Sequence, residues 1–343
     1  MMRSLASTFF ALIIGAIAQN TYSSDPPGIA FRLTPYYGIA VIHFENKTSI
    51  PVARIHGSPD YQAFMARTPD TQSSGEVSAL CRLLPALNHL TYPLNSTIDM
   101  CTNADVIHTK ALLASLKAAT ESYLGTNICY AILSLDDPST HKAHVAQQAL
   151  GALGLYQASR IVSTSKQFVV AYSPKTQPAF EEEPWPVLAV DYSAHWFNIG
   201  LYTIGEMGIV SSVEGFDVSS PRIDEEDQPG ALRDALRHLF DHPPIGMELP
   251  RQLRHLILYG DDVYNPVLRD ILTEVMRDGE TMTPHARDLL RDANVSSSVF
   301  DGPANTARLA YVITNGVDFY LNAPSAPGCK WRSKLYPRGK SEL

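Results

Sequence analysis

The residues with the clearest chemical potential lie in one stretch, Val187–Tyr202, which reads V-L-A-V-D-Y-S-A-H-W-F-N-I-G-L-Y. Its pattern predicts an apolar strand, a tight turn that opens at Asp191, and a second strand that runs back. When glycines line such a turn, several backbone N–H groups can converge on an anion such as phosphate. Here the turn holds Ser193, Ala194 and His195 instead. The segment therefore predicts the frame of an anion site whose centre is filled by side chains.

Other catalytic and metal-binding patterns are weak. The sequence contains no G-x-S-x-G, H-E-x-x-H or G-x-x-x-x-G-K-[ST] motif, which argues against hydrolase, metalloprotease and P-loop chemistry. His141 and His144 are three positions apart in a predicted helix, but no nearby Cys or carboxylate completes a ligand set. We therefore favour a solvated helix face there, and we expect neither a catalytic residue nor a resident metal.

Composition narrows the class of protein. The 343 residues are 45% hydrophobic and 18% charged, as in ordinary globular chains, and the length allows two lobes of about 150 residues. A net charge of −8 argues against non-specific nucleic-acid binding. A short basic tail, Lys330–Lys340, opposes the acidic excess. It is either solvated or a contact for a membrane surface or an acidic partner.

Both ends of the chain predict the secretory pathway. Residues 1–18 have the pattern of a signal peptide, with Arg3, the apolar run Phe9–Ala18 and a small-residue cleavage site. The run is too short to span a bilayer, so we expect no transmembrane span. The last residues, Lys340-Ser341-Glu342-Leu343, are similar to the K-D-E-L retrieval signal, although Ser341 departs from it. Secretion and retention in the endoplasmic reticulum lumen both stay open.

Covalent modification is expected in that pathway. Glycosylation sequons occur at Asn46, Asn95 and Asn294. The four cysteines are Cys81, Cys101, Cys129 and Cys329. They can pair in three ways, and proximity in sequence favours a Cys81–Cys101 disulfide. Cys129 lies in an apolar predicted strand, where a buried free thiol and a bridge are both plausible.

The elements that would position these residues alternate strands with helices. Besides the hairpin at Val187–Tyr202, we expect strands at Gly28–Leu33, Tyr37–Phe44, Ile50–Ile55, Ile128–Leu135, Ala158–Val162 and Leu253–Tyr259. We expect helices at Asp105–Leu124, Thr140–Leu153, Ser165–Tyr172, Gly230–Phe240, Pro266–Arg277 and Asn305–Leu321. Residues 57–103 are predicted to be mostly loop, with a short helix near Glu76–Leu84. Residues 173–186 are rich in proline and glutamate and predict a linker.

Five segments follow one another in the order of the motifs of a known family. They are Gly28–Thr34 (G-I-A-F-R-L-T), Ala118–Gly125 (A-A-T-E-S-Y-L-G), Arg160–Tyr172 (R-I-V-S-T-S-K-Q-F-V-V-A-Y), Val187–Tyr202, and Leu256–Pro266 (L-I-L-Y-G-D-D-V-Y-N-P). The family motifs are G-I-D-x-G-T-T, A-x-x-Y-L-G, R-I-I-N-E-P-T-A-A-A-L-A-Y, D-x-G-G-G-T and V-V-L-V-G-G-S-T-R-I-P. In this pattern the chain resembles the nucleotide-binding domain of the seventy-kilodalton heat-shock (DnaK-type) chaperones, which belong to the actin-like ATPase superfamily.

The resemblance implies an α/β, two-lobed actin-like ATPase fold of the ribonuclease-H-like kind. Lobe I would span 27–175 and lobe II 187–322, followed by the basic tail at 323–343, with nucleotide and metal bound between the lobes. About forty residues separate Gly215 from Leu256, where the family carries a helical subdomain that clasps the nucleotide. We therefore expect that subdomain to be largely missing.

The chain departs from the family where the chemistry would occur. The acidic residue of the first phosphate loop falls at Ala30, the neighbouring glycine at Arg32, and the glutamate of the lobe-joining helix at Thr164. Metal-assisted hydrolysis therefore has no obvious base or ligand set. Lost phosphate donors contribute about 1.5–3 kcal/mol each, so ATP affinity should fall by two or more decades. The positions that could still contact a nucleotide are Thr34, Asp191, Ser193 and Gly260.

These observations predict a catalytically degenerate, heat-shock-chaperone-like protein of the secretory pathway, a pseudo-ATPase that acts through protein–protein contacts as a chaperone-like factor or cochaperone. We expect no cofactor, and any binding of ATP and Mg²⁺ should be weak. Two alternatives remain open. One is an ATP-binding chaperone-type protein with residual ATPase activity. The other is a secreted small-molecule-binding protein that reuses the cleft between the lobes, where His195 and Trp196 either plug the cleft or contact a ligand.

Overall fold

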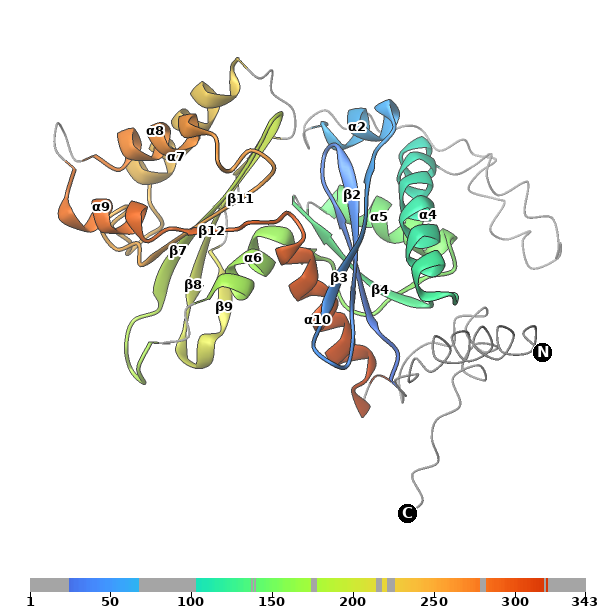
Figure 1. The fold of residues 1–343 in the computed structure, drawn as a ribbon. Helices are drawn as coiled ribbons and strands as arrows, with labels where there is room; N and C mark the ends of the chain where they lie inside the picture. The colour runs from blue at the N-terminus through green and yellow to red at the C-terminus, as the bar shows by residue number, and fades with distance from the viewer. Residues whose placement is uncertain are drawn as a thin grey trace, which may run out of the picture.

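Two β-sheets with the same strand order form the framework of the molecule (Figure 1). The structure is a computed structural model that describes residues 25–67, 103–136, 138, 140–173, 178–213, 218–220, 226–277, 282–317 and 319. The first sheet runs in the order β3 (Ser49–His56), β2 (Tyr37–His43), β1 (Gly28–Leu33), β4 (Tyr130–Leu135) and β5 (Tyr156–Gln157), with β6 (Val162–Ser163) also beside β4. The second runs in the order β10 (Val218–Ser220), β8 (Trp196–Ile204), β7 (Trp185–Ser193), β11 (His255–Tyr259) and β12 (Asn294–Val295), with β9 (Val210–Ser212) beside β8.

The strand directions repeat as well. In the first sheet, β1 pairs antiparallel with β2 and parallel with β4, and β4 pairs parallel with β5. In the second, β7 pairs antiparallel with β8 and parallel with β11, and β11 pairs parallel with β12. The second half of the chain therefore repeats the topology of the first, with β7 in the place of β1 and β11 in the place of β4. The expected α/β class is confirmed, with two mixed sheets.

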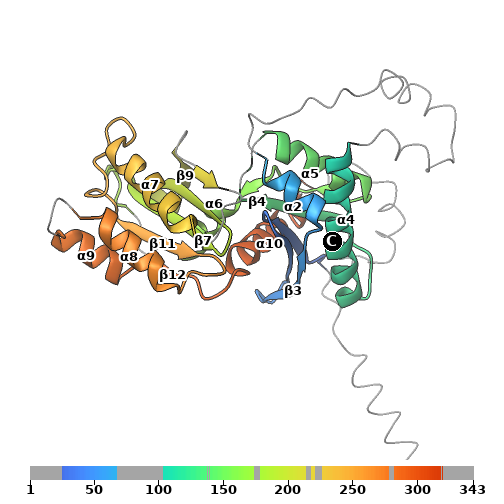
Figure 2. The same ribbon diagram turned by 90° about the horizontal axis from the view of Figure 1, so that it is seen from above.

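Helices cover each sheet, and in each half three of them bury an apolar core against it (Figures 1 and 2). In the first half the helices are α2 (Pro59–Met65), α4 (Ala104–Leu124) and α5 (Thr140–Ala152); their buried residues pack with those of β1 and β4. In the second half they are α7 (Gln228–Asp241), α8 (Pro266–Val275) and α9 (Pro284–Arg291), which pack on β7, β8 and β11. Each of these two cores is built from one sheet and the helices of the same half.

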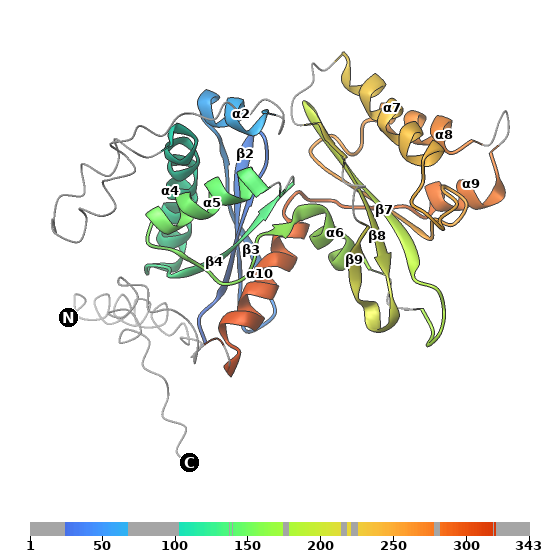
Figure 3. The same cartoon turned by 180° about the vertical axis from the view of Figure 1, so that it is seen from behind.

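Two further helices lie between the halves and cross over from the half in which they begin (Figures 1 and 3). Helix α6 (Thr164–Tyr172) follows the first sheet but packs on the second, where Phe168 and Val169 share a core with β7, β8 and β11. Helix α10 (Asp301–Thr314) follows the second sheet but packs on the first. A side chain at Gly28 of β1 would collide with Ala307 and Tyr311 of α10. The range 187–322 expected for lobe II thus contains a helix that packs with the first sheet.

The ends of several predicted elements are confirmed together with their causes. Asn265 caps α8 by accepting a hydrogen bond from the N–H of Val267, and Pro266 occupies the first turn. Helix α4 ends at Gly125, whose φ of 67° is left-handed. The predicted strands of the β1–β2–β3 meander are found within one or two residues of their expected bounds. Among the described residues, no helix combines the length and the apolar character needed to cross a bilayer.

The hairpin at 187–202 is present, but the expectation that its turn opens at Asp191 was wrong. Strand β7 continues to Ser193, and Asp191 pairs with Asn198 inside the ladder. The turn is reduced to Ala194 and His195. None of the described non-glycine residues with positive φ lies in it, so it does not adopt the left-handed backbone that a glycine-rich phosphate turn favours. Instead, the β7–β8 ladder continues up to the turn with residues other than glycine.

Other expectations need correction. The strand predicted at 158–162 is replaced by the short strands β5 and β6. Helix α2 lies in a segment predicted to be loop, and α9 was missed; each begins at a proline after a Ser or Thr cap. Both are too short for a clear apolar period. In α4, Ile107 and Tyr123 are exposed, whereas Leu112 and Leu116 are buried. The helix predicted at 76–84 lies outside the described residues.

Candidate functional site

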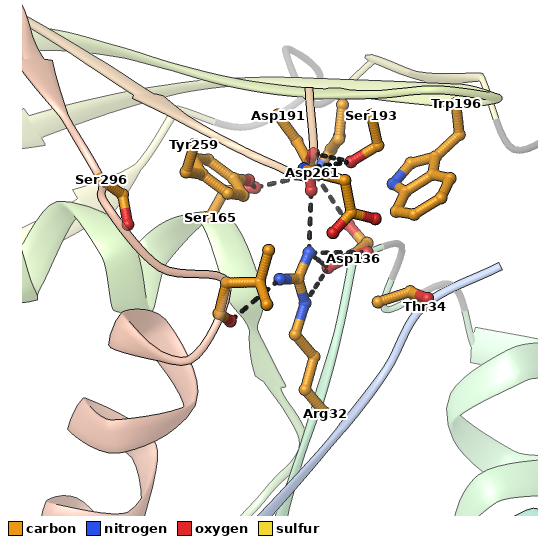
Figure 4. Close-up of polar contacts among 12 residues, drawn as sticks. Arg32, Thr34, Asp136, Ser165, Asp191, Ser193, Trp196, Tyr259, Asp261 and Ser296 are labelled. Carbon is orange, nitrogen blue, oxygen red and sulfur yellow. Dashed lines mark hydrogen bonds and ion pairs between the residues drawn. The ribbon is translucent and has the colours of Figure 1, made fainter. Parts of the chain in front are cut away.

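The carboxyl ends of the central parallel strands of both sheets meet at one place between the two halves (Figure 4). Arg32 lies near the end of β1, Asp136 directly follows β4, Asp191 lies near the end of β7, and Asp261 follows β11. We call these four residues and their neighbours the junction. In open α/β sheets, ligands bind beyond the carboxyl ends of the strands. The junction is therefore where the topology predicts a site.

A single buried arginine occupies the centre of the junction. The Arg32 guanidinium donates from Nη2 to Asp191 Oδ2 at 2.8 Å, and from Nε and Nη2 to the two oxygens of Asp136 at 3.1 Å each. The side chains of Arg32 and Asp191 are fully buried, and that of Asp136 is 2% exposed. Because Arg32 and Asp136 come from the first sheet and Asp191 from the second, the ion pairs join the two halves.

The protonation states follow from burial and from this pairing. Burial alone would lower the pKa of Arg32, but Asp136 and Asp191 outweigh it and the net pKa is raised, so the guanidinium stays charged. Burial raises the pKa of Asp191 to about 7, although Arg32 pulls it down. Burial also raises the pKa of Asp136, again against the pull of Arg32. One cation thus serves two carboxylates, and they resist ionisation together.

The other contacts of Asp191 are made within its own half. Its Oδ1 accepts a hydrogen bond from Ser193 Oγ at 2.8 Å, and Ser193 Oγ accepts from the N–H of Asp261 at 3.2 Å. Gly260 has a φ of 124°, and a Cβ there would overlap the Tyr192 carbonyl and Asp191 Oδ1. The residues expected to touch a nucleotide in this half therefore do come together, but their polar groups bind one another.

Thr34 lies at the end of β1 on the opposite side of the junction (Figure 4). Its hydroxyl accepts hydrogen bonds from the N–H groups of Tyr36 and Tyr37 and donates to the Tyr37 carbonyl at 2.9 Å. The side chain therefore closes its own β1–β2 turn. All of the expected nucleotide contacts are found at the junction, and the polar side chains among them already have partners within the protein.

A second polar network ties α6 into the junction. Asn198 of β8 donates to the Asp136 carbonyl at 2.9 Å and to Ser165 Oγ at 2.7 Å. The Tyr259 hydroxyl donates to the same Ser165 oxygen at 2.7 Å. Burial raises the pKa of Tyr259 well above its usual range, so the hydroxyl stays protonated and can donate. Asn198 of the second sheet and Ser165 of α6 are thus direct partners.

The hairpin turn fills the rest of the junction with aromatic side chains. Trp196 is 2% exposed and stacks on Tyr36 with ring centroids 5.3 Å apart, while Tyr37 meets it edge-on at 5.7 Å. His195 lies over Tyr36 at 5.1 Å. At the rim, Arg54 pairs with Asp261 at 2.9 Å, but both side chains are partly exposed, so this pair contributes less. Trp196 therefore packs between the halves, against Tyr36 and Tyr37 of the first half.

The predicted modification sites are only partly described. Asn46 is exposed in the β2–β3 turn, whereas Asn294 is half-buried in β12. Cys129 forms a disulfide bond, which excludes the free thiol. Asn95, Cys81 and Cys101 lie outside the described residues, so the proposed Cys81–Cys101 pairing stays a prediction. Within the described part of the chain, no three His, Cys, Asp or Glu side chains are grouped to hold a metal.

Sequence reasoning missed the central ion-pair network. Arg32 was noted only as a lost glycine, and Asp136 was not singled out. A signal existed, because an arginine within the apolar strand G-I-A-F-R-L must find a counter-charge if the strand is buried. Asp136, which directly follows the apolar strand Tyr130–Leu135, was a suitable candidate for that counter-charge.

The fold and the junction define the class of this protein. It is an α/β protein whose two halves repeat one topology and are joined by buried ion pairs. No protein-family model matches the chain, and no curated protein matches its sequence closely enough to count as a relative.

Proposed function

We propose that this chain has a two-lobed, actin-like ATPase architecture, resembles the nucleotide-binding domain of the seventy-kilodalton heat-shock chaperones, and is a catalytically degenerate pseudo-ATPase. In this proposal it works in the secretory pathway through protein–protein contacts, as a chaperone-like factor or cochaperone. The proposal rests mainly on one observation. The Arg32 guanidinium is ion-paired to Asp136 and Asp191 at the carboxyl ends of both central strands.

The argument is electrostatic. An ATPase of this architecture needs carboxylates at the junction to hold a divalent metal and its waters. Here the protein supplies its own cation to those carboxylates. Admitting a metal and a triphosphate would mean breaking ion pairs whose groups are fully buried. Breaking such a pair costs about 3–5 kcal/mol, which lowers an affinity by at least two decades.

The repeated strand order supports the proposed two-lobed architecture, because the second sheet has the same order of strands as the first. In addition, one helix from each half packs on the sheet of the other half. Three observations support the compartment: the signal-peptide pattern, the sequons and the disulfide at Cys129. Disulfides persist in the oxidising compartments of the secretory pathway and are rare in the cytosol.

Calorimetry with Mg-ATP on the full mature, glycosylated protein tests the ATPase part of the proposal. We expect no saturable heat at nucleotide concentrations up to about 1 mM, and binding tighter than about 10 µM would overturn the proposal. A well-characterised heat-shock ATPase domain under the same buffer conditions is the positive control.

The chaperone part needs a separate assay. Light scattering of a reduced, aggregating secretory protein should fall when this chain is added in stoichiometric amounts, and the effect should be the same with and without ATP. No suppression would overturn the chaperone-like assignment. Suppression that requires ATP would favour the second candidate, a chaperone-type ATPase with residual activity. That candidate is kept because Asp191, Ser193 and Gly260 do contact one another at the junction.

A further inference from the structure

An apolar surface is exposed at the end of the second sheet that lies far from the hairpin turn at the junction. Phe180, Met207 and Ile209 are 80%, 83% and 63% exposed. Phe180 precedes β7, and the other two lie in the turn that follows β8. We call these three residues, with the glutamates around them, the acidic tip. Clustered exposed apolar side chains rimmed by polar groups are typical of interaction sites.

The backbone of the acidic tip is held in place by hydrogen bonds. The Glu181 N–H donates to Glu206 Oε1 at 3.1 Å, which joins the two turns. The Glu182 carboxylate accepts from the Ala179 N–H and from Trp185 Nε1, each at 2.9 Å. The apolar side chains are therefore presented on fixed turns, which lowers the entropy cost of binding.

The same turns store backbone strain. Glu181 and Met207 have φ values of 71° and 60°, and they are two of only three non-glycine residues with positive φ among those described. Each such residue costs on the order of 1 kcal/mol or more, and strain of this kind concentrates at functional sites. The φ of Met207 belongs to the tight turn between β8 and β9, which a hydrogen bond from the Gly205 N–H to the Ile209 carbonyl closes at 2.9 Å.

The charge around the tip is predominantly negative. Glu181, Glu182, Glu183 and Glu206 are exposed on the same two turns as the apolar side chains. Arg254 acts on Glu182, and Arg251 lines one pocket together with Glu182 and Glu183. A suitable occupant therefore combines aromatic or aliphatic side chains with several positive charges.

This chain carries such a segment in its own C-terminal tail. Residues Lys330–Lys340 read K-W-R-S-K-L-Y-P-R-G-K, in which five basic residues alternate with Trp331, Leu335 and Tyr336. From Phe319 to Leu335 an extended chain reaches about 55 Å, compared with a radius of gyration of about 20 Å for a globular chain of this length. In Figure 1, α10 and the outer ends of β8 and β9 point to the same side of the molecule.

We propose that Lys330–Lys340 binds the acidic tip of the same molecule. The tail's aromatic and aliphatic side chains cover Phe180, Met207 and Ile209, and its basic side chains pair with the surrounding glutamates. This inference does not depend on whether the junction binds a nucleotide.

Photo-crosslinking in the full mature chain tests the proposal. Leu335 is replaced by benzoylphenylalanine, and crosslinked peptides are mapped by mass spectrometry after irradiation. We expect crosslinks to residues 178–185 and 205–210 in the monomer. The double variant Phe180→Ser/Met207→Ser should lower their yield by about fivefold or more, the effect of removing roughly 1 kcal/mol of contact. Raising the salt concentration should lower it as well.

Matched controls keep the test decisive. Tyr264→Ser and Val312→Ser remove side chains that are 72% and 62% exposed elsewhere and should leave the yield unchanged. A mixture of light and heavy isotope-labelled chains separates binding within one molecule from binding between two. Crosslinks to other surfaces, crosslinks only between chains, or a yield unaffected by the double variant would each overturn the proposal.

Discussion

The junction and the acidic tip differ in what they bury: the junction buries charged side chains, and the acidic tip exposes apolar ones. At the junction, Arg32 and Asp191 are fully buried and paired. At the tip, Phe180 and Met207 are at least 80% exposed. At the place where topology predicts ligand chemistry, the central charged side chains are paired with one another, whereas a place without such a prediction presents apolar groups to solvent. The difference supports the proposal that this protein acts through contacts on its surface rather than through a ligand between its halves.

The largest effect should come from removing the central cation. Arg32→Met leaves Asp136 and Asp191 buried without a counter-charge, so the free energy of unfolding should fall by about 3–5 kcal/mol. Urea denaturation of the purified variant measures it. If the variant fails to fold, the triple variant Arg32→Met/Asp136→Asn/Asp191→Asn should restore much of the loss, since it removes all three charges together. A loss below about 1 kcal/mol in the single variant would show that the pairs do not hold the halves together.

Gly260→Ala should have the next largest effect. The added Cβ meets the Tyr192 carbonyl and Asp191 Oδ1, and the φ of 124° is unfavourable for any side chain. We expect a loss of about 2–3 kcal/mol in the free energy of unfolding. Gly246→Ala is the matched control, since its φ is 85° but nothing lies within 4 Å of the new Cβ. Equal losses in the two variants would mean that backbone strain alone is responsible.

The pH dependence of stability tests whether Asp136 and Asp191 share the single cation Arg32. The pKa of Asp191 is about 7 in the folded protein, above its unfolded value, so its protonation favours the folded state. This contribution is complete below pH of about 4 and is lost as the pH rises through about 7. The free energy of unfolding should therefore rise on acidification from pH 7 to 6, by up to about 1.4 kcal/mol.

Asp191→Asn is the control for that measurement, because it should remove most of the rise. The pKa values of His43 and His255 are lowered by burial, so these groups oppose the trend near pH 6 in both proteins. The difference between wild type and variant cancels them. An identical slope in the two proteins would contradict the assignment.

The smallest effect is expected at the tip. Phe180→Ser should change the free energy of unfolding by no more than about 0.5 kcal/mol, because the ring is 80% exposed. Phe168→Ala is the contrasting variant. Its ring is fully buried and stacks on Tyr259 at 4.0 Å, so the loss should be about 3–5 kcal/mol. A large loss for Phe180→Ser would mean that the tip is part of the folded core.

Local signals in the sequence were sufficient for much of the fold. The cap at Asn265, the stop at Gly125 and the apolar strands of the β1–β2–β3 meander were predicted from neighbouring residues and found in place. Asp191, Ser193 and Gly260, which the sequence assigned to one site, do lie together, while their contact with a nucleotide stays a prediction. The ion pairs at this site were not predicted, because the pairing of Arg32 with Asp191 spans 159 residues of sequence. No local pattern encodes a contact of that range.

The sequence alone determined most of the longer helices and strands and several of their ends, because capping and apolar periodicity act within a few residues. It also showed that glycines are missing from the hairpin turn at 193–196. Only the tertiary structure decided what fills the place between the halves, that α6 and α10 exchange sheets, and that Asp191 lies inside a strand. These features depend on packing two sheets against each other, and a buried charge finds its partner only when that packing is complete.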